Sequence, residues 1–101
     1  MEFRQACYLI FGWKMDLAVP GVYRLSSMFA ESETDHLLFK IKELGQDKPN
    51  ELQLEILPTE FSNQVSDKIE MYLQKMNSYP AFLSAITMDL FERQTQTIFR
   101  K

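Results

Sequence analysis

The chain has 101 residues, of which 46% are hydrophobic and 25% are charged, and its formal net charge is −3. This length is typical of one domain, and the composition supports a folded core rather than a disordered chain. The negative balance argues against nucleic-acid binding, which depends on a net basic surface. The single cysteine, Cys7, excludes an internal disulfide, and together with the single histidine, His36, it cannot complete a four-ligand zinc site.

The composition also argues against a membrane protein and against an enzyme. The longest unbroken apolar run, from Ala6 to Phe11, has six residues, whereas a membrane span needs about 20. A single histidine leaves few routes to histidine-assisted nucleophilic catalysis. We therefore expect a small intracellular domain, part of a longer protein, that binds other proteins and has no catalytic residue, cofactor or metal.

The first predicted element is a short helix that is apolar nearly all round. Phe3, Ala6, Cys7 and Ile10 recur at helical spacing, but their neighbours are apolar too. Such a helix needs the domain on one side and a second partner, most simply a second copy, on the other. Because no capping residue precedes it, we interpret residues 1–11 as the end of an upstream coiled-coil helix and residues 12–101 as a head domain.

From Gly12 the apolar period changes to two. It predicts four strands, over residues 13–19, 22–30, 37–42 and 52–56. Pro20-Gly21 makes the first turn, and residues 45–50 form a loop of hairpin length. Consecutive strands with short connections pair antiparallel.

After Pro58 the period becomes helical again. One apolar stripe runs from Phe61 to Met76, and after a break at residues 77–80 a last helix of about 15–18 residues carries Phe82 to Phe91. We therefore expect an α+β two-layer sandwich with an N-terminal helix, a four-stranded antiparallel sheet and two C-terminal helices, similar to the RWD fold. The helices cover the apolar face of the sheet, and the other face is open.

Six stretches resemble one family in order and spacing. They are residues 2–8 with Gly12-Trp13, residues 23–27 with 29–31, residues 38–40, residues 59–62, residues 80–84 running to Leu90-Phe91, and Arg93-Gln94-Thr95. Together they span nearly the whole chain and resemble the C-terminal head of the spindle checkpoint family mitotic-arrest-deficient one.

The resemblance implies a non-catalytic interaction domain at the end of a long coiled coil, which forms a homodimer through the N-terminal helix. It implies a nuclear protein, at the nuclear envelope in interphase and at kinetochores in mitosis, that binds a Bub-family checkpoint kinase. It also implies a role in assembling the mitotic checkpoint complex, in which mitotic-arrest-deficient two inhibits the coactivator of the anaphase-promoting complex. The family's Arg-Leu-Lys motif and its segment for mitotic-arrest-deficient two lie upstream of Glu2, so this chain is expected to bind those partners weakly by itself.

Four residues are candidate partner-binding residues: Phe3, Arg4, Tyr8 and Arg24. Arg4 and Tyr8 lie one helical turn apart, so the guanidinium could meet a phosphate or carboxylate beside an apolar seat. The alternative is that Tyr8 lies in the seam between two copies of the helix and that Arg4 is simply solvated. Arg24 shares the open sheet face with Lys14, Lys40 and Lys42, which could attract acidic or phosphorylated peptides or could simply be solvated.

Thr95 is a candidate phosphorylation site, because the resemblance implies that the monopolar-spindle kinase modifies it and that the coactivator's tail then docks. Thr97 is a rival site, and an ordinary solvated threonine is the alternative. Two other functions stay open: the structural RWD head of another kinetochore linker, and a relative of ubiquitin-conjugating enzymes. Conjugating chemistry needs a nucleophilic cysteine in a loop after the sheet, whereas Cys7 lies in the first helix.

Overall fold

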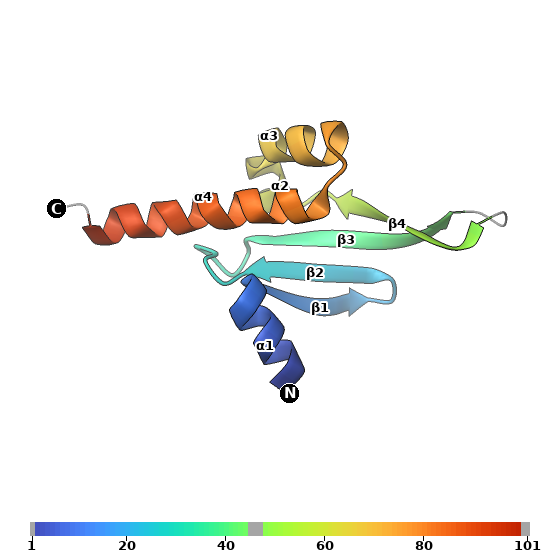
Figure 1. Cartoon of the computed structure of the whole chain (residues 1–101), viewed down its shortest axis with the longest axis horizontal. Helices are drawn as coiled ribbons and strands as arrows, with labels where there is room; N and C mark the ends of the chain where they lie inside the picture. Colours follow the sequence, from blue (N-terminus) through green and yellow to red (C-terminus); the bar gives the residue numbers. More distant parts are fainter. Residues whose placement is uncertain (1, 45–47, 100–101) are drawn as a thin grey trace.

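The structure, a computed structural model, describes residues 2–44 and 48–99 (Figure 1). In chain order the elements are α1 (Glu2–Phe11), β1 (Trp13–Val19), β2 (Val22–Ser27), β3 (His36–Leu44), β4 (Lys48–Leu57), α2 (Glu60–Gln64), α3 (Ser66–Lys68), the π-helix η1 (Ile69–Lys75) and α4 (Tyr79–Phe99). The predicted α+β class, with one helix, four antiparallel strands and C-terminal helices, is confirmed. None of the helices in the described part of the chain is long and apolar enough to span a membrane.

The four strands form a meander in the order β1-β2-β3-β4. Gly21, with φ of +82°, supplies the left-handed conformation that the turn between β1 and β2 needs. Leu25 stands between Met15 on β1 and Leu37 on β3, so these three side chains share one face of the sheet. A bulge between Leu17 and Val19 breaks the predicted alternation, because it sets Val19 opposite Val22 on the other face.

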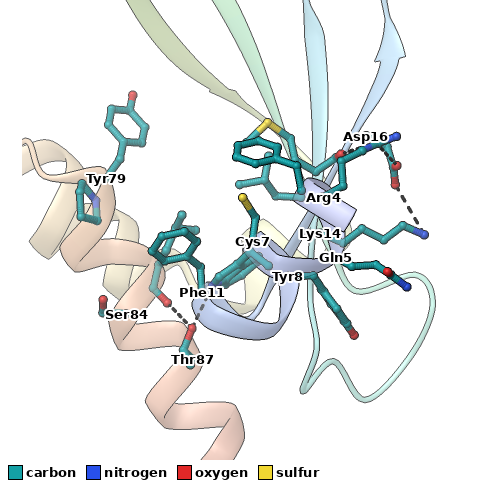
Figure 2. A pocket seen from close by; sticks show the side chains of 16 residues that line it. Arg4, Gln5, Cys7, Tyr8, Phe11, Lys14, Asp16, Tyr79, Ser84 and Thr87 are labelled. Atoms are coloured by element: carbon teal, nitrogen blue, oxygen red, sulfur yellow. Dashed lines mark hydrogen bonds and ion pairs between the residues drawn. The ribbon is translucent and has the colours of Figure 1, made fainter. Parts of the chain in front are cut away.

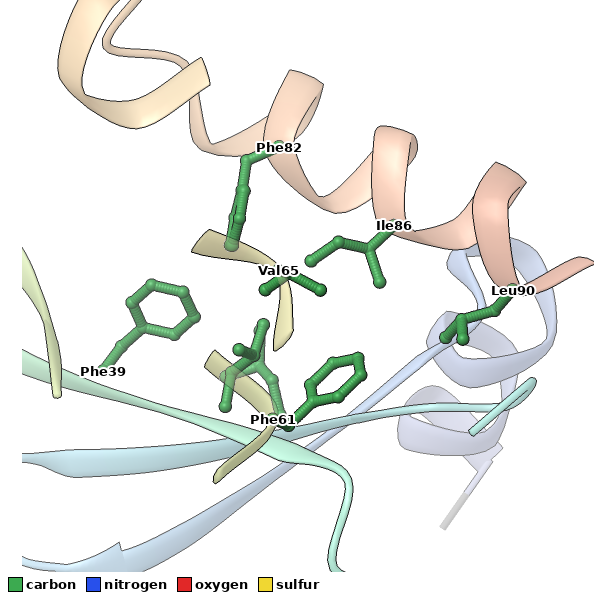
Figure 3. Packing of buried hydrophobic residues seen from close by; sticks show 8 residues of the cluster. Phe39, Phe61, Val65, Phe82, Ile86 and Leu90 are labelled. Carbon is green, nitrogen blue, oxygen red and sulfur yellow. The ribbon is translucent and has the colours of Figure 1, made fainter. Parts of the chain in front are cut away.

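The core lies between this face of the sheet and the C-terminal helices (Figure 3). Its buried hydrophobic residues are Leu25, Leu37, Phe39, Phe61, Val65, Phe82, Ile86 and Leu90. Phe82, Ile86 and Leu90 recur at intervals of four, so that one stripe of α4 enters the core. The predicted apolar stripe of the last helix is thus confirmed from Phe82 to Leu90, whereas Phe91, its expected last member, is 42% exposed.

The single helix expected from Phe61 to Met76 is wrong, because the segment divides into α2, α3 and η1. Val65 leaves the helical region with φ −109° and ψ 27°, and its side chain is buried. The break turns the chain, so that Phe61 and Val65 both enter the core and Ile69 and Tyr72 of the next segment still pack against it.

Several boundaries also differ from the prediction. α4 has 21 residues rather than about 15–18, since no Gly or Pro interrupts it before Phe99. β2 ends at Ser27 rather than Ala30, because the Ser27 hydroxyl accepts a hydrogen bond from the Phe29 N–H and turns the chain. β4 begins at Lys48, inside the expected loop, of which residues 45–47 lie outside the described residues.

α1 does not cover the sheet as expected. Figure 1 shows α2, α3 and α4 gathered on the side of β3 and β4, with α1 beyond the opposite edge, next to β1. Met15 and Leu17, which point to the same face as the core, are therefore 55% and 59% exposed. The C-terminal helices reach β1 only at Trp13, and the rest of the strand borders a groove.

Candidate interaction surface

An open groove of about 1360 Å³ lies between α1, β1 and the N-terminal half of α4 (Figure 2). Cys7 and Phe11 lie on its α1 side, and Ser84 and Thr87 lie on its α4 side. Trp13, Met15 and Leu25 contribute from the sheet. The lining is mostly apolar, so the groove suits an apolar side-chain row better than a charged small molecule.

A hydrogen-bond chain fixes the α4 wall of the groove. The indole Nε1 of Trp13 donates to Oγ1 of Thr87 over 2.9 Å, and this hydroxyl donates to the carbonyl oxygen of Leu83 over 2.8 Å. The bonds join β1 to α4 across the groove floor. The polar groups of Trp13 and Thr87 therefore already have hydrogen-bond partners. A partner that enters the groove can contact the apolar side chains around them without leaving these groups unsatisfied.

Arg4 attaches α1 to the edge of the sheet. Its Nη2 donates to the carbonyl oxygen of Met15 over 3.0 Å and to Oδ1 of Asp16 over 3.2 Å. The bond to Met15 satisfies a backbone group on the free edge of β1, which an edge strand otherwise leaves to water. The Arg4 side chain is 68% exposed, so this ion pair is a weak one that a stronger anion could displace.

Three of the four predicted partner-binding residues lie together, and the fourth lies apart. Phe3, Arg4 and Tyr8 all line the groove, with Phe3 78% exposed and Tyr8 half-buried. Arg24 is exposed on the opposite face of the sheet, across from Asp16 and Leu38. The candidate residues therefore belong to two separate surfaces.

Large apolar side chains of α1 and β1 remain exposed, and three of them, Phe3, Phe11 and Met15, line the groove. We call this set the α1–β1 surface: Phe3, Leu9, Ile10, Phe11, Met15 and Leu17. Each is more than half exposed, and a cluster of this kind marks an interaction site in a folded protein. The sequence indicated the α1 part through its all-round apolarity. The sequence did not predict the exposed apolar residues of β1, because a strand shows the same alternation of apolar and polar residues whether or not a helix covers it.

Thr95 lies near the end of α4, where its hydroxyl donates to the backbone carbonyls of Phe91 and Glu92 over 2.8 and 3.1 Å. The residue is half-buried. Arg93, two residues earlier, bonds Asp89 at 2.8 Å and lies 3.5 Å from Glu31. The side chain of the rival residue Thr97 lies outside the described residues.

Cys7 and His36 are both half-buried. The apolar residues next to Cys7 in the sequence suggest a buried side chain. In the structure, Cys7 lies on α1 and lines the groove, so it is only partly buried. Within residues 2–44 and 48–99, no three His, Cys, Asp or Glu side chains gather in a way that could hold a metal ion.

The comparisons with known proteins agree on one family. The sequence model of a family described as "Mitotic checkpoint protein" matches residues 1–95. The human mitotic spindle assembly checkpoint protein MAD1 is 43% identical over 94 residues, which are 93% of this chain and 12% of the relative. The mitotic spindle checkpoint protein MAD1 of Arabidopsis thaliana is 32% identical over 103 residues, covering 92% of this chain and 13% of the relative. The chain thus spans about an eighth of the length of these relatives.

Proposed function

Since the chain belongs to the mitotic checkpoint protein family, whose relatives are spindle assembly checkpoint proteins, we propose that it is a non-catalytic, RWD-type interaction domain of that checkpoint. In this role it supports recruitment to kinetochores, binding of a Bub-family checkpoint kinase and assembly of the mitotic checkpoint complex that inhibits the anaphase-promoting complex. The observation that carries the proposal is the α1–β1 surface, which exposes large apolar side chains beside an open groove.

The first partner is a second copy of the chain, bound through α1. Residues 1–11 then continue an upstream coiled coil, and residues 12–101 form the head. α1 has 10 residues, and isolated helices below about 12–15 residues are marginal in water. The dimer of this chain is therefore weak, and it becomes tight when the preceding coiled coil is restored.

Light scattering over a concentration series tests the dimer. The chain should shift from monomer to dimer with increasing concentration, and a version extended upstream by several heptads should stay dimeric throughout. Ile10→Glu should shift the chain toward monomer, because it places a charge in the seam. If both versions remain monomeric at high concentration, α1 does not form the dimer.

The second partner is the checkpoint kinase, which Phe3, Arg4 and Tyr8 contact. A phosphate group carries about −1.5 to −2 charges and three acceptor oxygens, against a single charge on a carboxylate, so it can replace Asp16 as the ligand of Arg4. Phe3 and Tyr8 provide the adjacent apolar seat. The segment that captures mitotic-arrest-deficient two lies upstream of Glu2 in this proposal, so that partner needs the longer chain.

A pull-down with a Bub-kinase peptide, phosphorylated and unphosphorylated, tests this site. The extended version should retain the phosphorylated peptide, Arg4→Gln should weaken retention, and Lys75→Gln, a cation on η1, should not. Equal retention of the two peptide forms would contradict a phosphate-dependent site.

Thr95 is the proposed site of the monopolar-spindle kinase, after which the coactivator's N-terminal tail docks. A phosphate adds about −1.5 to −2 charges near a helix C-terminus, where the macrodipole is already negative. It also removes the hydroxyl from its bonds to Phe91 and Glu92. The end of α4 should therefore fray on modification. Phosphopeptide mapping with Thr95→Ala and Thr97→Ala decides between the two residues, and an unmodified Thr95 would refute the assignment.

We place the full-length protein in the nucleus, at the nuclear envelope in interphase and at kinetochores in mitosis. Imaging of the tagged full-length protein through the cell cycle tests this location.

A further inference from the structure

The face of the sheet turned away from the helices carries a row of cations. β1 presents Lys14 on this face, β2 presents Arg24, and β3 presents Lys40 and Lys42, as the strand register requires. All four side chains are exposed. Figure 1 shows α2, α3 and α4 on the other side of the core and α1 beyond the β1 edge, so no helix covers this face.

The register sets Lys14, Arg24 and Lys40 along one diagonal of the sheet, and Lys42 follows Lys40 two residues further along β3. Lys14 is opposite Ser26, and Arg24 lies two residues further along β2. Arg24 is opposite Leu38, and Lys40 lies two residues further along β3 in the same direction. Diagonal neighbours of this kind are about 7–8 Å apart. Residues on one side of an extended peptide recur at about 7 Å, so an extended chain can match the diagonal step by step.

In the middle of the diagonal, Arg24 is opposite Asp16 and Lys40 is opposite Glu55, but neither cation forms a direct ion pair with these carboxylates. At one end Lys14 lies 3.9 Å from Asp16, and at the other end Lys42 forms a 2.8 Å ion pair with Glu55. Arg24 and Lys40 form no ion pair with any residue that the structure describes. The described residues of this face thus hold four cations against two carboxylates, on a chain whose net charge is −3.

Apolar side chains lie between the two unpaired cations and beside them. Val22 is opposite Lys40, Leu38 is opposite Arg24, and Leu57 is opposite Leu38. All three are half-buried although no helix packs on them. The face therefore offers a short apolar seat flanked by two cations that form no direct ion pair with a described residue, which differs from an evenly solvated sheet surface.

We propose that this open face binds an extended acidic peptide segment of a partner protein, with Arg24 and Lys40 as its anchors. Carboxylate side chains at every second residue point toward the sheet and meet the diagonal cations, and their methylene groups rest on Val22 and Leu38. The diagonal spacing of the cations matches the side-chain repeat of an extended polypeptide, and the apolar seat between them suits its side chains, so a polypeptide is favoured over nucleic acid. The site is independent of the groove and of the partners assigned to it.

The test measures fluorescence anisotropy of a labelled peptide of alternating glutamate and leucine, titrated with the full chain at low and physiological salt. The parent should bind, and higher salt should weaken binding. Arg24→Gln and Lys40→Gln should each weaken binding by about threefold to tenfold, as expected for exposed charge contacts, and the double variant should weaken it further. Lys75→Gln, a 63% exposed lysine on η1, should bind like the parent.

Chemical-shift mapping of the backbone amides separates a local site from general attraction. Shifts confined to β2 and β3 support the proposal, and circular dichroism confirms that the variants are folded. The proposal is overturned if Lys75→Gln loses as much affinity as Arg24→Gln, or if the shifts fall in the groove. It is also overturned if a single-stranded oligonucleotide binds tighter than the peptide through the same residues.

Discussion

Phe82 and Tyr8 show how differently two aromatic residues can serve the same domain. Phe82 lies on α4 and is completely buried in the core, whereas Tyr8 lies on α1 and is half-buried at the groove. Phe82→Ala should destabilise the domain by about 3–5 kcal/mol, because it leaves a cavity in the core. Tyr8→Ala should cost about 1 kcal/mol or less, since it lies at the surface.

Urea unfolding followed by circular dichroism measures both values. Against a total stability of about 5–15 kcal/mol, the first loss moves the midpoint strongly and the second hardly at all. Equal midpoints for the two variants would mean that Tyr8 packs into the core and does not face a partner.

Glu55 and Lys42 form the tightest ion pair on the open sheet face. The hydrogen bond and charge of Lys42 lower the pKa of Glu55 below its ordinary value of 4.5, and Lys40 adds to the effect. A lowered folded-state pKa means that the stabilising contribution is present above the ordinary value and is lost as the pH falls through the folded value.

Lys42→Gln should raise the pKa of Glu55 toward 4.5, which an NMR titration of its carboxyl carbon measures. Lys75→Gln is the matched control and should leave that pKa unchanged. A titration curve that Lys42→Gln does not move would show that the pair does not persist in solution.

At the scale of elements, the connection into α2 depends on Thr59. Its hydroxyl accepts a hydrogen bond from the N–H of Ser62 and donates to the carbonyl oxygen of His36, both over 3.0 Å. The Ser62 hydroxyl accepts the N–H of Thr59 over 2.8 Å, which completes a capping box. Thr59 therefore begins the helix and also ties it to β3.

Thr59→Ala should cost about 1–2 kcal/mol of stability, since the cap is lost and the His36 carbonyl loses its donor. Thr59→Ser keeps the hydroxyl and should restore most of the loss. Thermal unfolding distinguishes the two variants. A serine variant as unstable as the alanine variant would assign the effect to the methyl group instead of the cap.

The sequence predicted the strands well because their alternation extends over several residues on both faces. It also placed Phe82 and Leu90 on the buried stripe of the last helix. It could not predict the break at Val65, because the apolar spacing through this residue fits a continuous helix equally well. It could not predict the exposure of Met15 either, since coverage of a strand depends on where distant helices end.

At the same scale, the candidate site was predicted only in part. Phe3, Arg4 and Tyr8 share one surface because helical spacing fixes their mutual positions. The separation of Arg24 from them depends on where α1 sits relative to the sheet. That position is set by contacts such as Arg4 with Asp16, which the sequence alone does not reveal.

At the scale of the whole molecule, the two faces of the sheet differ in chemistry. One face leads into an apolar groove beside α1, and the other carries the diagonal of cations. The single tryptophan, Trp13, lies at the groove and can report its occupation by fluorescence. Acidic peptide bound to Arg24 should leave this fluorescence unchanged, whereas dimerisation through α1 should alter it.

We propose that the α1–β1 surface, with Tyr8 beside Phe3 in the groove lining, is the functional surface of a checkpoint domain. This proposal is tested most directly by replacing the endogenous protein in cells with full-length variants and measuring the mitotic arrest after microtubules are depolymerised. A double variant, Phe3→Ala with Tyr8→Ala, should lose the arrest. Met76→Ala, a large-to-small change at a residue that is 64% exposed directly after η1, should keep it. A normal arrest with the double variant would contradict the account.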